Sequence, residues 1–172
     1  RRATVNSEAR LAWGFAHEKH PVDIFAYVRT LHEQDGVAAM HSTNYTDTLI
    51  HPSEDCRVNV ATVPKKEGSV ARMLYERIVD TPNTLENDDL LSTVAAVRKD
   101  IPEDEHTLFH AEYFSKGQAC MRASQLAKTF GWAIHHDRAA KIALIDPRSA
   151  HFSEISNNLS IKHVTGMRNK RA

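Results

Sequence analysis

The stretch Trp132-Ala133-Ile134-His135-His136, followed by Lys141-Ile142-Ala143-Leu144-Ile145, decides the fold that this sequence predicts. Both runs are short, largely apolar and rich in β-branched or aromatic residues, which is typical of strands. Residues 137–140 are few enough to join the two runs as a hairpin. We therefore expect this hairpin to form part of a small antiparallel sheet.

Two further strands are expected upstream of the hairpin, over residues 44–51 and 57–63. The first run is rich in β-branched and aromatic residues. In the second run, Val58 and Val60 alternate with polar neighbours, as in a half-buried strand. Residues 52–55 between the two runs favour a turn.

Three helices are expected between these strands and the hairpin. Ser69 is the predicted N-cap of the first, Asn87 caps the second, and Pro102 opens the third. The third helix should bury the side formed by its apolar residues, which are Leu108, Phe109, Tyr113 and Phe114. A short turn of helix around 126–130 and another helix over 149–156 complete the prediction. The expected class is α+β, with the small antiparallel sheet packed against three or more helices.

Composition excludes several classes of protein. The 172 residues contain 22 Lys+Arg and 22 Asp+Glu, so no net charge attracts nucleic acid or an anionic membrane. No run approaches the roughly 20 apolar residues that span a bilayer. Cys56 and Cys120 are too few for a disulfide framework and no secretory signal is evident, so we expect a soluble, cytoplasmic protein with reduced thiols.

The chain divides near Met40. Residues 1–39 differ from the rest in their pattern of apolar and polar residues. Within them, an apolar stripe predicts a helix over 22–34. We expect 1–39 to be an N-terminal extension that is not clearly native to the protein. We expect 40–172 to be a single α+β domain.

Several stretches after residue 39 resemble a small bacterial family of unknown function. The opening is Met40-His41-Ser42-Thr43-Asn44-Tyr45, followed by Asp55-Cys56. The middle is Phe114-Ser115-Lys116-Gly117-Gln118-Ala119-Cys120-Met121-Arg122-Ala123-Ser124. Gly131-Trp132-Ala133-Ile134-His135-His136-Asp137 and the tail 167–172 also fit. The resemblance implies that the domain starts at Met40, and it implies no reaction. The chain departs from it at the hairpin turn, where Arg138-Ala139-Ala140 stands in place of an expected Gly.

The segment 116–124 is the first candidate site. If it is extended, its period of two places Lys116, Gln118, Cys120, Arg122 and Ser124 on one face. A neighbouring cation can activate the Cys120 thiol as a nucleophile, or Lys116, Arg122 and Ser124 can bind an anion. The plainer alternative is a small buried cysteine beside a structural arginine.

The strand 132–137 is the second candidate site. Alternation places Trp132, Ile134 and His136 on one face and His135 with Asp137 on the other. The His135–Asp137 pair is the spacing that orients an imidazole as a general base. Trp132 and His136 are candidate ligand-binding residues. A hydrogen-bonded histidine on a sheet surface is the plainer alternative.

No metal site and no cofactor are predicted. His106 and His110 share a helix face, but they lack further paired ligands, so a solvated face is the favoured interpretation. The predicted function is binding of a small molecule or anion between 116–124 and 132–137, with an enzymatic role left open. The alternative is a non-catalytic protein or RNA interaction module that uses the basic tail 159–172, although nucleic acid is the weaker expectation.

Overall fold

A computed structural model describes residues 41–169 of the chain. The expected extension 1–39, its helix over 22–34, and the end of the basic tail lie outside the described residues.

Four strands form one sheet in the order β3-β2-β1-β4. The pairs β1–β2 and β2–β3 are antiparallel, whereas β1–β4 is parallel. The α+β class is thus confirmed, but the sheet is mixed and not wholly antiparallel. The strands are β1 (Thr48–His51), β2 (Ala133–His136), β3 (Ile142–Ile145) and β4 (Lys162–Thr165).

Strand β4 was not predicted, because its residues were interpreted as part of a basic tail. Lys162 and His163 are exposed, and Val164 and Thr165 are only half-buried, so no apolar alternation marks the run. It is a strand because its backbone pairs with the edge of β1, from Thr48↔Lys162 onward.

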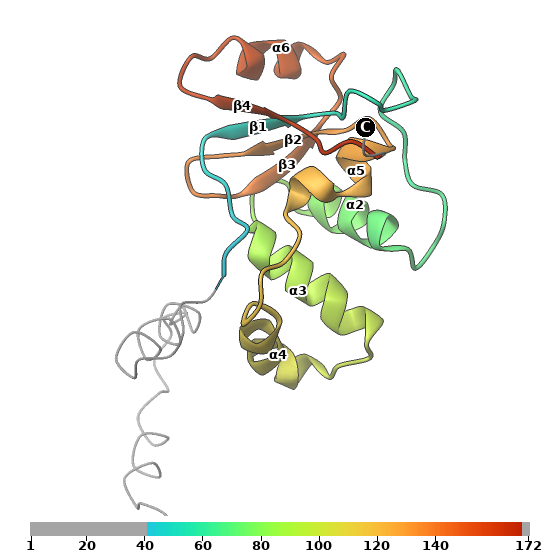
Figure 1. Cartoon of the computed structure of the whole chain (residues 1–172), viewed down its shortest axis with the longest axis vertical. Helices are drawn as coiled ribbons and strands as arrows, with labels where there is room; N and C mark the ends of the chain where they lie inside the picture. Colours follow the sequence, from blue (N-terminus) through green and yellow to red (C-terminus); the bar gives the residue numbers. More distant parts are fainter. Residues whose placement is uncertain (1–40, 170–172) are drawn as a thin grey trace, which may run out of the picture. The chain divides into compact units, whose positions relative to one another are not determined.

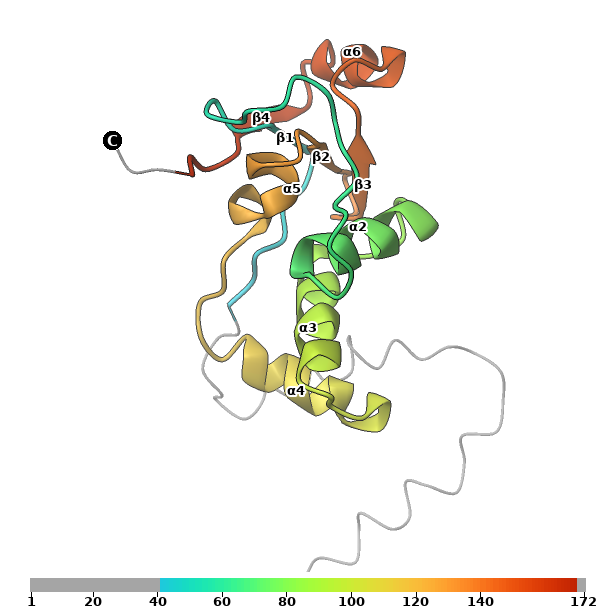
Figure 2. The same ribbon diagram turned by 90° about the vertical axis from the view of Figure 1, so that its right-hand side faces the viewer.

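Helices cover the two faces of the sheet unequally. Figures 1 and 2 show α6 on one side of the sheet and α2 with α5 on the other, with α3 and α4 beyond α2. The helices are α2 (Val70–Asp80), α3 (Asn87–Arg98), α4 (His106–Tyr113), α5 (Gln125–Lys128) and α6 (Ala150–Ser156). Two 3-10 turns, Glu103–Glu105 and Met121–Ala123, precede α4 and α5.

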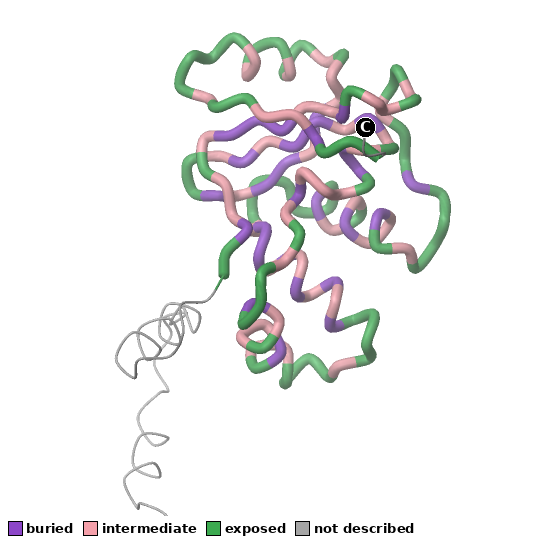
Figure 3. The backbone as a smooth tube through the Cα atoms, viewed as in Figure 1, coloured by how far each residue is buried: buried purple, intermediate pink, exposed green. Residues whose placement is uncertain are grey.

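Strand alternation sends successive side chains to two separate cores. On the α2 side, Ile50, Ile134 and Ile142 join buried residues of α2, α3 and α5 in the larger cluster. On the α6 side, Leu49 belongs to a smaller cluster, which the half-buried Phe152 of α6 partly covers. Figure 3 shows the buried backbone running along the strands, while most of α6 is exposed or half-buried.

The predicted hairpin is confirmed, and its turn explains why no glycine is needed. The Asp137 carboxylate accepts hydrogen bonds from the backbone N–H groups of Ala139 and Lys141, each at 2.8 Å. Ala140 adopts the left-handed conformation, with φ of 61°. That conformation strains a residue with a Cβ, and the two Asp137 hydrogen bonds hold it in place.

Four local predictions were wrong or need correction. Residues 57–63 form no strand, since the segment joins no sheet and Val60 is exposed. The strand expected from residue 44 begins only at Thr48.

Asn87 is the first residue of α3, and Glu86 is its N-cap. Leu108 is 74% exposed, because α4 turns only Phe109 fully towards its neighbours. The Ser69 cap is confirmed, since its side chain accepts from the Arg72 N–H.

Candidate functional site

Tyr45 brings together residues from both predicted sites. Its hydroxyl lies 3.2 Å from the Cys120 sulfur, at hydrogen-bond distance. Its ring meets the ring of His136 edge-on, with the centroids 5.3 Å apart. Arg122 also approaches the Tyr45 hydroxyl, and its Nε donates to the Thr165 carbonyl of β4 at 2.9 Å. Cys120, Arg122 and His136 therefore meet around Tyr45, a residue that sequence reasoning had not singled out as functional.

Burial sets the electrostatics of this group. Burial, and then the contact with Cys120, raises the pKa of Tyr45, while Arg122 opposes the shift. His136 is 0% exposed, and neither of its ring nitrogens has a hydrogen-bond partner. Its burial lowers its pKa to about 4. His136 is consequently a neutral imidazole at pH 7, and its unpartnered nitrogens cost stability.

The predicted row of side chains along 116–124 does not form. The segment is not extended throughout, because the 3-10 turn Met121–Ala123 interrupts it. Lys116 is exposed. Ser124 caps α5, and its hydroxyl accepts from the Leu126 N–H. Gln118 donates to the Tyr113 carbonyl.

No hydrogen bond or ion pair joins the predicted His135–Asp137 pair. Asp137 uses its carboxylate to organise the hairpin turn. His135 lies on the α6 side of the sheet, opposite Leu49 of β1, and its Nε2 is buried without a hydrogen-bond partner. Burial lowers the pKa of His135, and Asp137 opposes this from a distance. The pair therefore lacks the hydrogen bond that would orient a general base.

Trp132 plays a packing role. Its indole Nε1 donates to the Thr62 carbonyl at 2.9 Å, and its ring lies 5.5 Å from that of Tyr75. It packs against the larger core, on the face that the strand alternation predicts for Ile134 and His136. The indole thus anchors the irregular segment 57–63 to the domain.

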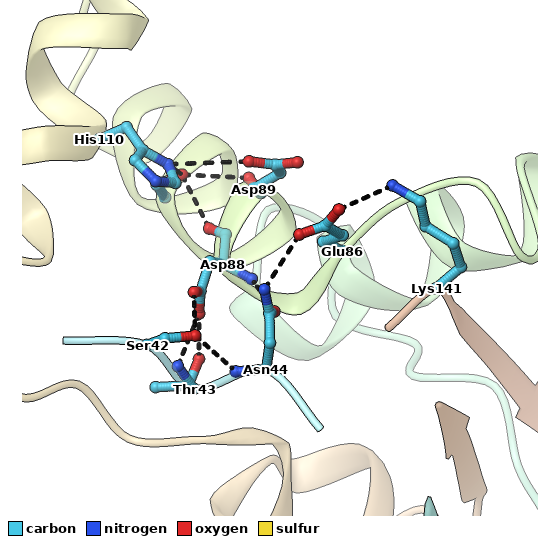
Figure 4. A network of polar contacts seen from close by, with 9 residues as sticks. Ser42, Thr43, Asn44, Glu86, Asp88, Asp89, His110 and Lys141 are labelled. Carbon is cyan, nitrogen blue, oxygen red and sulfur yellow. Dashed lines mark hydrogen bonds and ion pairs between the residues drawn. The ribbon is translucent and has the colours of Figure 1, made fainter. Parts of the chain in front are cut away.

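A second polar cluster, unforeseen from the sequence, lies at the start of α3 (Figure 4). The buried Asp88 carboxylate accepts from the Ser42 hydroxyl at 2.7 Å and from the Thr43 N–H and hydroxyl at 2.8 and 2.6 Å. Asn44 accepts from the Asp88 N–H and donates to Glu86. The opening segment thus caps α3 from 45 residues away along the chain. Small polar side chains are the usual helix caps, but the sequence could not show which helix they would meet.

His110 also belongs to this end of the molecule, so the solvated helix face predicted for His106 and His110 is wrong. The His110 Nδ1 lies 2.8 Å from the Ser92 hydroxyl and 3.9 Å from the Asp89 carboxylate (Figure 4). His106 Nε2 lies 3.1 Å from the Ile101 carbonyl. Both imidazoles hold α4 in place.

The chain end after β4 packs against residues 51–55 and α5. Gly166 approaches so closely that an added Cβ would lie 3.1 Å from the Ser53 nitrogen. The Asn169 N–H then donates to the Asp55 carboxylate at 2.7 Å, and its side chain donates to the Lys128 carbonyl. Arg168 pairs with Glu54. Part of the predicted basic tail is therefore built into the domain.

A depression of about 340 Å³ lies beside this docked chain end, and Asp55, Arg57, Lys128, Thr129 and Asn169 line it. Within residues 41–169, the side chains of Arg57 and Lys128 form no ion pair or hydrogen bond. The Thr129 hydroxyl donates to Gln125. The two cations are thus the groups that remain available to a ligand.

A family model matches residues 40–172. The chain belongs to DUF6157, a family of unknown function. The predicted family resemblance is confirmed at that level. No curated protein and no solved structure matches the chain.

Two of the stretches that carried the resemblance meet at the depression of this DUF6157 domain. Asp55 and Asn169 form one wall of it, held together by their mutual hydrogen bonds. The opening stretch instead caps α3, and the middle stretch supplies Cys120 and Arg122 beside Tyr45. The stretches therefore contribute to three places in the fold, and the opening stretch contributes to two of them, because Tyr45 belongs to it.

Two kinds of site are not found in the described part of the DUF6157 domain. No group of three or more His, Cys, Asp or Glu side chains between residues 41 and 169 is arranged to hold a metal ion. None of the helices in the same range has the length and apolar character to cross a bilayer.

Proposed function

We propose that this domain binds a small anionic molecule, with a phosphate or carboxylate group held between Arg57 and Lys128. The observation that carries the proposal is the depression that both side chains line while neither has a protein partner. Arginine presents a fork of donors that matches two oxygens of such a group, and lysine adds a compact charge. The proposed anion site therefore lies outside the segment 116–124, which the sequence analysis favoured.

The local charge supports an anion and predicts modest affinity. Two cations face one carboxylate, Asp55, whose oxygens already accept from Ser53 and Asn169. Two charge-assisted hydrogen bonds contribute about 1.5–3 kcal/mol each, or about 3–6 kcal/mol together, which corresponds to a Kd between about 6 mM and about 40 μM for inorganic phosphate. Arg57 is exposed, so added salt weakens the interaction.

The size of the depression favours a small organic ligand. Its volume of about 340 Å³ lies near the lower end of the range usual for small-molecule sites. We assign no reaction, because the Asp55 carboxylate and the Thr129 hydroxyl that line it are already hydrogen-bonded to Asn169 and Gln125. The cytoplasm is the proposed location, supported by Cys56 and Cys120, which are both free thiols.

The test is a titration of the full-length, isotope-labelled chain with inorganic phosphate, followed by NMR. Amide signals of the residues that line the depression should shift in a saturable way. Arg57→Gln and Lys128→Gln should each weaken binding about tenfold, because each removes one charge-assisted contact. The matched control is Arg138→Gln, an exposed arginine of the hairpin turn, which should leave the Kd unchanged.

Equal phosphate affinity in the wild type and both depression variants would overturn the proposal. A single-stranded RNA oligonucleotide tests the alternative of an interaction module. If the chain binds RNA, and if Arg138→Gln weakens RNA binding as much as the two depression variants do, the interaction is a diffuse electrostatic one. That result would also contradict a localised anion site.

A further inference from the structure

Two histidines face each other across the parallel pair β1–β4. The register places His51 opposite Thr165 and Leu49 opposite His163, so both histidines lie on the same face as diagonal neighbours. Their ring centroids are 5.0 Å apart, and the ring planes are inclined by 31°. The Nε2 atom of His51 lies 2.8 Å from the Nδ1 atom of His163. The sequence alone did not suggest the pair, because β4 was not predicted.

A contact this short requires one hydrogen between the two nitrogens. One ring donates its N–H and the other accepts through a lone pair. Burial, and then the neighbouring His163, lowers the pKa of His51, which favours its neutral form. Neutral imidazole is the form that binds metal ions. The pair thus places two nitrogen ligands next to each other, and a small separation and tilt of the rings would direct both at one ion.

We propose that His51 and His163 together bind a divalent late transition metal ion, of the class of Ni²⁺, Cu²⁺ or Zn²⁺. Imidazole nitrogen is a preferred ligand of these ions. Metal–nitrogen bonds of about 2.0–2.1 Å in a tetrahedral site put the nitrogens about 3.3 Å apart, so the rings separate by about 0.5 Å. The hydrogen between them moves to the outer nitrogen of its own ring. Both rings stay neutral, and water fills the other coordination positions.

The surrounding structure supports a site that exchanges metal with solvent. His163 is exposed and His51 is half-buried, so an ion reaches them directly. The Phe152 ring of α6 packs edge-on against His51, with the centroids 5.5 Å apart and the planes at 89°. This contact restricts the orientation of the His51 ring. No third His, Cys, Asp or Glu completes a metal cluster among residues 41–169, which predicts weaker binding than at a structural zinc site.

The site would cross-link the edge of the sheet. β4 follows α6 in the chain and pairs only with β1, so an ion bound by one histidine from each strand ties the edge strand to the sheet. Anything that binds the folded state in preference to the unfolded chain raises the unfolding temperature. The proposal thus predicts metal-dependent stabilisation, which is independent of any anion at the depression.

The test is calorimetric titration of the full chain with NiCl₂, with thermal unfolding as a second measurement. His51→Gln and His163→Gln should each weaken Ni²⁺ binding at this site by about tenfold or more. Both should also reduce the rise in Tm that Ni²⁺ produces in the wild type. His151→Gln is the matched control, since it removes an exposed histidine on α6 that has no contact with the pair. MgCl₂, a cation that prefers oxygen ligands, should give no rise in Tm.

Other histidines and the two thiols also bind metal ions, so the comparison between variants decides the outcome. Wild-type Ni²⁺ affinity and an unchanged rise in Tm in both His51→Gln and His163→Gln would overturn the proposal. The proposal would also be overturned if His151→Gln lost the Ni²⁺-induced rise in Tm while His51→Gln and His163→Gln kept it. Because His163 is exposed, His163→Gln should fold normally even if His51→Gln disturbs the packing of Phe152.

Discussion

The two faces of the sheet carry cores of different size, and the difference shows where this domain derives its stability. The α2 face buries ten residues in one cluster that spans the sheet and three helices. The α6 face buries three residues, which are Leu49, Ala133 and Ile145, under side chains that are themselves only half-buried. Since burial of apolar area is the main favourable term in folding, the α2 face should dominate stability.

The two faces also differ in their polar groups. On the α2 face, His136 is completely buried without a hydrogen-bond partner. On the α6 face, His51 and His163 bond to each other near solvent. A buried polar group without a partner is a cost that only a large core can offset, whereas a solvent-accessible pair is available to ligands. The larger face thus supplies most of the core, whereas the smaller one leaves the His51–His163 pair accessible to solvent.

The largest expected effect is on the α2 face. Ile134→Ala should lower the free energy of unfolding by about 4 kcal/mol, because the fully buried side chain leaves a cavity between β2 and the helices. Chemical denaturation measures the change. Ile145→Ala on the α6 face should cost about 2 kcal/mol, since its neighbours there can close around the cavity. Equal losses would show that the two cores contribute alike.

Acid should destabilise the domain through His136. Its pKa falls from an ordinary value near 6.5 to about 4, so between these values the unfolded chain binds a proton that the native protein does not. Stability is therefore fully present above pH 6.5 and declines as the pH falls towards 4, by about 3 kcal/mol from this residue. The depressed pKa of His135 acts in the same direction.

The variant His136→Phe isolates that contribution. It removes the buried nitrogens, and its stability at pH 7 should equal or exceed that of the wild type. The difference in free energy of unfolding between the two proteins should widen as the pH falls from 6.5 to 4. A constant difference across this range would mean that His136 does not titrate as expected.

A smaller effect is expected from the cover of the α6 face. Phe152→Ala should cost about 1 kcal/mol, because the ring is only half-buried and α6 has no fully buried residue. Thermal unfolding measures it. The same variant frees the His51 ring, so Ni²⁺ binding should also weaken slightly. A loss as large as that of Ile134→Ala would place α6 within the principal core.

The smallest effect is expected from residues 1–39. The family model begins at residue 40, and the pattern of apolar and polar residues in the sequence changes there. A chain truncated to residues 40–172 should unfold within about 0.5 kcal/mol of the full chain, as changes outside a core usually do. Loss of cooperative unfolding on truncation would show that the N-terminal residues contribute to one of the two cores.

Predictions from the sequence succeeded where a local pattern determines the structure. The hairpin strands, the Ser69 cap and the positions of the main helices follow from alternation, helical spacing and capping chemistry. They failed where a distant segment supplies the partner. β4 needs the edge of β1, and the run 57–63 has strand-like alternation but no partner strand. Alternation alone therefore cannot distinguish a strand from an irregular segment that packs against the domain.

The predictions of candidate site residues also succeeded where a local pattern was enough and failed where a distant segment supplies the partner. The sequence identified Cys120, Arg122 and His136 as residues of interest, and they do meet, but only because Tyr45 bridges them. It could not show that Ser124 and Asp137 are used by a cap and a turn. Those assignments depend on backbone geometry that residue spacing does not fix.

Local patterns in the sequence account for the α+β class, the hairpin and the helices, because each of these depends on interactions within a few residues along the chain. Only the tertiary structure decided what becomes a site. The depression at Lys128 needs the end of the chain to dock beside Asp55, and the His51–His163 pair needs a parallel strand. Both contacts join residues more than 100 positions apart. Contacts at that separation are set by the packing of the whole domain, and no local pattern encodes them.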